Sequence, residues 1–148
     1  MAKVLLINPQ FNIVKENYDS SVSVGLLSIA SFLDSQGVNI KLIDCVRQKN
    51  YLDIIQKEIV DCEYAGLSVM TMQLPKAMEI AKQIRQFNPR CKIVWGGSHP
   101  TFFIHQTTEH DLVDAVCFGE GEMTMLELAQ GRPWQDVKGV AYKMENGR

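Results

Sequence analysis

Residues 64–97 read YAGLSVMTMQLPKAMEIAKQIRQFNPRCKIVWGG, and this stretch decides the fold class. A short apolar run stands at each end, and the apolar residues between them recur at helical spacing. Pro75 suits the first turn of a helix and Pro89 ends it, which predicts a helix at 74–88. A strand, a helix and a second strand in this order are typical of a unit whose two strands are parallel.

The same alternation continues on both sides of this unit. The predicted strands are 3–8, 39–44, 64–70, 91–95 and 115–118, with a further strand-like run at 137–144, and the predicted helices are 23–36, 51–60, 74–88 and 121–130. The stretch 96–111 shows no clear period and is predicted to be a long irregular loop. The pattern predicts an α/β fold: a five-stranded parallel sheet with helices on both faces.

The end of the chain predicts a partial hairpin. Asn146 and Gly147 follow the last strand-like run, and Asn-Gly favours a hairpin turn because both residues tolerate positive φ. A return strand is expected next. We therefore interpret 1–134 as one α/β domain and 135–148 as the start of a linker or hairpin.

Composition excludes several classes of function. The chain has 148 residues, 46% of them hydrophobic, which is enough for one sizeable core. Its formal net charge of −2 provides no basic surface for nucleic acid or acidic lipid. The apolar run at 4–7 is far too short for a signal peptide or a membrane span. These features predict a cytoplasmic protein that binds neither nucleic acid nor membrane.

The cysteines do not form a metal-binding motif. Cys45, Cys62, Cys91 and Cys117 are widely separated, whereas a loop that wraps a metal ion or a cluster needs closely spaced ligands. Cys91 and Cys117 fall in strand-like runs, where a small buried thiol is the expected role. No metal site is predicted.

The candidate ligand-binding residues are those at the carboxyl ends of the strands. Ligands of open parallel sheets bind at this edge, where the strand order reverses, and small residues let a large ligand approach the backbone. The predicted cofactor-binding residues are Asn8 after the first strand, Ser68, Met70 and Thr71 after the third, Gly96, Gly97 and Ser98 after the fourth, and Gly119, Glu120 and Gly121 after the fifth.

Three other sites known on this fold fit the sequence poorly. A dinucleotide site needs G-x-G-x-x-G after the first strand, whereas GEGEMT at 119–124 follows the fifth, lacks the third glycine and carries two glutamates that would repel a pyrophosphate. A flavin phosphate site needs a compact loop of Ser, Thr and Gly after the first strand. Residues 10–18 instead form a long segment of mixed composition. A receiver domain needs an acceptor Asp at the end of the third strand, where this chain has Ser-Val-Met-Thr at 68–71 and no aspartate.

Taken together, the segments resemble a known family. They are KVLLINP (3–9), VGLLSIASFL (24–33), LID (42–44), YAGLSVMT (64–71), WGGSHPT (95–101), FGEGEMT (118–124) and GVAYKMENG (139–147). This combination is similar to the cobalamin-binding domain that precedes the catalytic barrel in many radical SAM enzymes, among them methyltransferases and the anaerobic magnesium-protoporphyrin monomethyl ester cyclase. The similarity covers essentially the whole chain, and it implies a Rossmann-like (flavodoxin-like) fold with a five-stranded parallel sheet of order 2-1-3-4-5.

The resemblance implies where the nucleotide tail of cobalamin would lie. Ser68-Val69-Met70 stands at the family's S-x-L element, whose serine hydrogen-bonds the tail, and Gly96-Gly97 matches the G-G that leaves room for it. The tail would lie between the first and third strands, and a leucine at Gly97 would block it. The family's D-x-H-x-x-G loop is absent, because no histidine precedes His99. This implies a base-off, His-off cobalamin, or a degenerate domain that binds none.

The resemblance also implies a role for the chain. It would be the cobalamin-binding module of a radical SAM methyltransferase or cyclase, with no catalysis of its own. Its partner would be the C-terminal radical SAM barrel, which would hold the 4Fe-4S cluster and S-adenosylmethionine. The alternative is a degenerate cobalamin-binding-like domain with a structural or substrate-covering role. Binding of hydroxocobalamin distinguishes the two.

Overall fold

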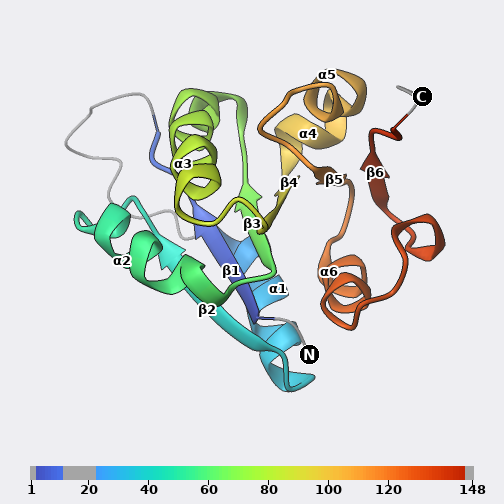
Figure 1. Cartoon of the computed structure of the whole chain (residues 1–148), viewed down its shortest axis with the longest axis horizontal. Helices are drawn as coiled ribbons and strands as arrows, with labels where there is room; N and C mark the ends of the chain where they lie inside the picture. Colours follow the sequence, from blue (N-terminus) through green and yellow to red (C-terminus); the bar gives the residue numbers. More distant parts are fainter. Residues whose placement is uncertain (1–2, 12–22, 146–148) are drawn as a thin grey trace.

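The computed structural model describes residues 3–11 and 23–145 and contains one six-stranded sheet of order β2-β1-β3-β4-β5-β6 (Figure 1). The strands are β1 (Lys3–Asn8), β2 (Asn39–Asp44), β3 (Tyr64–Ser68), β4 (Lys92–Gly96), β5 (Ala115–Cys117) and β6 (Val140–Tyr142). The first five are parallel in the predicted order 2-1-3-4-5, which is confirmed, and β6 runs antiparallel to β5.

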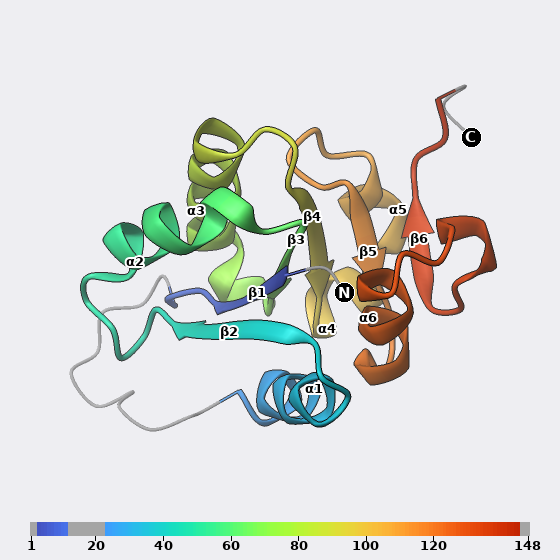
Figure 2. The same ribbon diagram turned by 60° about the horizontal axis from the view of Figure 1, so that its bottom comes forward.

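Helices cover both faces of the sheet, as predicted. They are α1 (Val24–Ser35), α2 (Tyr51–Glu58), α3 (Leu74–Phe87), α4 (Ser98–Phe102), α5 (Ile104–Thr108) and α6 (Glu122–Ala129), with 3-10 turns η1 (Ile59–Asp61), η2 (Thr71–Gln73) and η3 (Trp134–Asp136). Figure 2 shows α2 and α3 on one side of the sheet and α1 on the other. The buried residues of α6 share a cluster with those of α1.

The alternating side chains of β1 explain the two layers. Leu5 and Ile7 pack in the cluster that contains residues of α2 and α3, whereas Val4 and Leu6 pack in the cluster that contains residues of α1 and α6. All four are at most 1% exposed. A central parallel strand reads as a continuous apolar run because both of its faces are covered.

The prediction of an irregular loop at 96–111 was wrong, because two short helices, α4 and α5, lie there. Each has only five residues, too few to show a helical period in the sequence. In both helices a threonine hydroxyl donates to the carbonyl four residues earlier: Thr101 Oγ1 lies 2.8 Å from the Gly97 oxygen, and Thr107 Oγ1 lies 2.7 Å from the Phe103 oxygen.

The sheet has one strand more than predicted. The strand-like run at 137–144 contains β6, which pairs antiparallel with β5 and begins directly after Gly139, a turn residue with φ 82°. The Phe118 amide donates to the Gly139 carbonyl at 2.9 Å and extends this pairing. The predicted turn at 146–147 lies outside the described residues, as does most of the segment weighed above as a flavin loop. No helix in the described ranges is long and apolar enough to cross a membrane.

Candidate functional site

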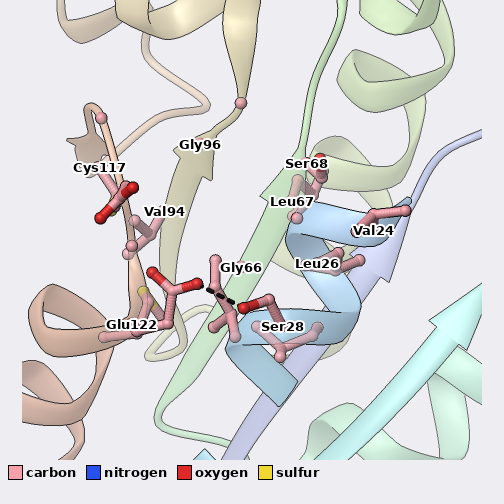
Figure 3. Close-up of a pocket in the computed structure, with 18 residues that line it drawn as sticks. Val24, Leu26, Ser28, Gly66, Leu67, Ser68, Val94, Gly96, Cys117 and Glu122 are labelled. Atoms are coloured by element: carbon pink, nitrogen blue, oxygen red, sulfur yellow. Dashed lines mark hydrogen bonds between the residues drawn. The ribbon is translucent and has the colours of Figure 1, made fainter. Parts of the chain in front are cut away.

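A pocket of about 350 Å³ opens at the carboxyl edge of the sheet, on the face covered by α1 and α6 (Figure 3). Its floor comes from the sheet, and its walls come from the two helices and from the turns after β4 and β5. The residues that line it are Leu6, Val24, Gly25, Leu26, Ser28, Ile29, Gly66, Leu67, Ser68, Val94, Gly96, Gly97, Cys117, Gly119, Glu120, Gly121, Glu122 and Met125.

The floor of the pocket is apolar. Leu6, Gly66 and Val94 stand side by side on three neighbouring strands, because Leu6 is in register with Gly66 and Gly66 with Val94. A Cβ on Gly66 would lie 2.9 Å from Leu6 Cδ2, so this glycine allows Leu6 to pack over the sheet. Cys117 completes the floor, and burial raises the pKa of its thiol to about 11, which keeps it neutral near pH 7.

The glycines of the pocket walls differ in how much free space surrounds them. A Cβ on Gly25 or Gly119 would meet nothing within 4 Å, and one on Gly96 would make only ordinary contact with Cys117. A Cβ on Gly121 would lie 2.8 Å from Ile29 Cδ1. Gly25, Gly96 and Gly119 therefore leave space free in the structure, whereas a side chain at Gly121 would require the end of the Ile29 side chain on α1 to shift.

The pocket has few polar side chains. Ser28 Oγ on α1 donates to Glu122 Oε1 on α6 at 2.7 Å, the bond drawn in Figure 3. Ser68 ends β3 at the mouth and Glu120 lies in the turn after β5. No lysine, arginine or histidine is among the residues described as lining it. The described residues thus make an apolar site with hydroxyl and carboxylate groups and no positively charged side chain.

Six of the ten predicted binding residues line this pocket: Ser68, Gly96, Gly97, Gly119, Glu120 and Gly121. Asn8, Met70, Thr71 and Ser98 do not. Met70 is 48% exposed, and Ser98 is the first residue of α4. The Thr71 hydroxyl lies 3.0 Å from His99 Nδ1, so these two side chains hold each other outside the pocket.

Asn8 belongs to a buried hydrogen-bond network below the edge of the sheet. Its amide nitrogen donates to Asp44 at 3.2 Å, and its amide oxygen accepts from Gln73 Nε2 at 2.8 Å. Gln73 is 1% exposed, also donates to the Pro9 carbonyl at 2.8 Å, and accepts from the Met70 amide at 2.9 Å. The network joins the ends of β1 and β2 to η2.

Several lining residues were missed by sequence reasoning. Gly25, Ser28 and Ile29 belong to α1, whose sequence indicates only a packing helix. Gly66 could have been predicted as a lining residue, because a glycine inside a strand often marks the close approach of another group. The sequence indicated Glu122 as a charge that would repel a pyrophosphate and as a carboxylate favoured at a helix start, because the Ser28 hydroxyl from which it accepts is remote in the sequence.

Comparison with known proteins points to one family. A family model described as the B12 binding domain matches residues 13–129. An uncharacterized methyltransferase of Pyrococcus horikoshii is 33% identical over 132 residues, covering 84% of this chain and 28% of that protein. The anaerobic magnesium-protoporphyrin IX monomethyl ester cyclase of Rubrivivax gelatinosus is 34% identical over 113 residues, covering 71% of this chain and 19% of that protein. The chain thus spans about a quarter of the length of these relatives or less.

A solved structure shares the fold. The cobalamin-dependent S-adenosylmethionine radical enzyme OxsB, with aqua-cobalamin and S-adenosylmethionine bound, superposes with a TM-score of 0.81 at 23% identity. The match covers 100% of this chain and 21% of that one. The apo form of the same enzyme matches with a TM-score of 0.69.

Proposed function

The chain belongs to the B12 binding domain family, and from that premise we propose that its pocket receives the nucleotide tail of cobalamin. The volume of about 350 Å³ is at the lower end of the range for small-molecule sites, so it can take the tail while the much larger corrin ring remains outside. The tail would contact the α1 and α6 face of the sheet.

The observation that carries this proposal is the free space beside the glycines. Gly25 and Gly119 have nothing within 4 Å of where a Cβ would stand, and the floor of Leu6, Gly66 and Val94 is apolar. A flat aromatic base with an attached sugar needs such an apolar slot with a few hydrogen-bonding groups. Ser68 and Ser28 provide neutral hydroxyls for this purpose.

We propose further that cobalamin binds base-off and without a histidine on cobalt. The support comes from the sequence: no histidine precedes His99, so the loop after β1 has no histidine that could reach cobalt. The Nδ1 atom of His99 lies 3.0 Å from the Thr71 hydroxyl. When bound, cobalamin would supply an organometallic cobalt centre, and the chain's own residues would orient the tail and exclude water from it.

For the whole protein we infer a radical SAM enzyme of the methyltransferase or cyclase type. The relatives are longer than this chain, and their names include both activities. A C-terminal barrel would be the partner and would hold the 4Fe-4S cluster and S-adenosylmethionine, so this chain alone would not catalyse a reaction. Its four free cysteines suit a reducing compartment, which supports the expected cytoplasmic location.

A titration with hydroxocobalamin tests the binding site. Gly25 is one helical turn before Ser28 and Ile29, which contact α6 across the pocket, so a side chain at 25 projects toward the same space. We expect Gly25→Phe to weaken binding at least about tenfold, because the ring competes with the tail for the apolar slot. Ser31→Phe is the matched control, since Ser31 is exposed on α1 and does not line the pocket.

The wild type should bind and show a base-off absorbance spectrum, and the control should match it. Equal affinity in the wild type and Gly25→Phe, with both folded, would place the tail elsewhere. A spectrum typical of a nitrogen ligand on cobalt would contradict the His-off proposal. No binding by the wild type would favour the structural or substrate-covering role.

A further inference from the structure

We propose that Glu122, oriented by Ser28, is the residue that distinguishes a corrinoid with a nucleotide tail from one without it. The carboxylate would accept a hydrogen bond from a ribose hydroxyl of the tail. This inference rests on the proposed function and assigns a specificity-determining role within the same pocket.

The geometry of the Ser28–Glu122 pair is the first support. The two residues come from opposite walls, and Ser28 donates to Glu122 Oε1 at 2.7 Å across the pocket (Figure 3). This bond holds the carboxylate at the pocket, where it is only partly exposed to solvent. A serine that fixes a carboxylate in this way leaves the other oxygen able to accept from a ligand.

The absence of competing partners is the second support. In the ranges 3–11 and 23–145 the Glu122 side chain makes no ion pair and no hydrogen bond besides the one from Ser28. By contrast, Glu127 on the same helix is paired with Arg132 at 2.6 Å. A carboxylate beside an apolar cavity that keeps a free oxygen is suited to receive a donor from a bound molecule.

The charge of the pocket decides which part of the tail can approach. The two charged side chains among its described lining residues, Glu120 and Glu122, are both acidic. A phosphate beside these two carboxylates is repelled, whereas neutral groups that donate hydrogen bonds are favoured there. The nucleotide tail has both kinds of group, so its base and ribose hydroxyls would enter and its phosphate would remain toward solvent.

The test compares hydroxocobalamin with aquacobinamide, a corrinoid that lacks the nucleotide tail, on the 148-residue chain. Removal of a hydrogen bond to a charged group corresponds to roughly a tenfold or greater loss of affinity. We therefore expect Glu122→Ala to weaken cobalamin binding at least about tenfold and to leave cobinamide binding unchanged. Glu122→Gln, which keeps an acceptor oxygen, should recover part of the affinity, and Ser28→Ala should cause a smaller loss, again for cobalamin alone.

Asp34→Ala is the control for charge, because Asp34 is exposed on α1 and does not line the pocket. This variant should bind hydroxocobalamin and aquacobinamide with the wild-type affinities. Equal losses for both corrinoids in Glu122→Ala, or no loss for either, would overturn this inference and leave the proposed function standing. Wild-type chain that binds neither corrinoid would overturn the proposed function and this inference with it.

Discussion

A Cβ on Gly97 would lie 3.0 Å from the backbone nitrogen of Val69 and 3.0 Å from its carbonyl oxygen. Gly97 also has φ 98° and ψ −170°, a conformation that is essentially restricted to glycine. The turn after β4 thus packs backbone to backbone on the end of β3. A leucine at Gly97, which was expected to block the tail, would therefore also strain this backbone.

The first prediction is that Gly97→Ala destabilises the fold. The strained φ and the contact with Val69 should together lower the free energy of unfolding by about 2–3 kcal/mol. Urea denaturation followed by circular dichroism measures this. Gly25→Ala is the control, because its Cβ meets nothing within 4 Å and the helix should gain up to about 1 kcal/mol. A Gly97→Ala protein as stable as the wild type would contradict the backbone conformation described here.

The second prediction concerns Ser68, the hydroxyl at the mouth of the pocket. One neutral hydrogen bond contributes about 1 kcal/mol, so Ser68→Ala should weaken hydroxocobalamin binding about fivefold with no change in stability. Ser98→Ala should have no effect, since Ser98 does not line the pocket. A larger loss of hydroxocobalamin affinity in Ser98→Ala than in Ser68→Ala would indicate that the binding site lies nearer α4.

The third prediction concerns the buried amide of Gln73. Gln73→Leu removes three hydrogen bonds and leaves the Pro9 carbonyl, the Asn8 amide oxygen and the Met70 amide without this partner. We expect the free energy of unfolding to fall by about 3 kcal/mol. Gln86→Leu, at an exposed position of α3, should change it by less than about 0.5 kcal/mol. If urea denaturation gave the two variants equal stability, the network would have no structural role.

The fourth prediction is that stability falls at alkaline pH because of the cysteines. Burial raises the pKa of Cys45 and Cys91 to about 12 and that of Cys62 and Cys117 to about 11, from an ordinary value of 9.0. Above about pH 9 the unfolded thiols lose protons while the folded ones keep them. The unfolded state then binds fewer protons, so the free energy of unfolding falls as pH rises from about 9 toward 11.

Urea denaturation between about pH 8 and pH 10 measures how steeply the free energy of unfolding falls with pH. Cys45→Ala should reduce this slope by the contribution of one thiol. A disulfide-forming thiol reagent should label the four cysteines only after denaturant is added, because all four are buried. Rapid labelling of the native chain, or a stability that does not change over this pH range, would contradict the burial of the thiols.

Local sequence signals were sufficient for the elements with clear boundaries. β1 and β2 have the predicted limits, because an apolar run is closed at Asn8-Pro9 and the segment 39–44 follows Gly37, a residue type that commonly ends a helix. β3 ends at Ser68, two residues earlier than predicted. The cause is tertiary: the Val69 carbonyl accepts from the His99 amide at 3.1 Å in the turn after β4, so residue 69 leaves the ladder.

The sequence by itself determined the layered α/β fold, because the periods of short segments distinguish strands from helices. Its resemblance to a known family predicted the strand order, and the residues at the strand ends predicted the edge of the sheet at which the pocket opens. Only the tertiary structure decided which wall residues form the pocket, because Ser28 and Glu122 meet through the packing of α1 against α6. It also decided which glycines leave space and which are required by the backbone, since Gly25 and Gly97 look alike in a sequence and differ only in what surrounds them.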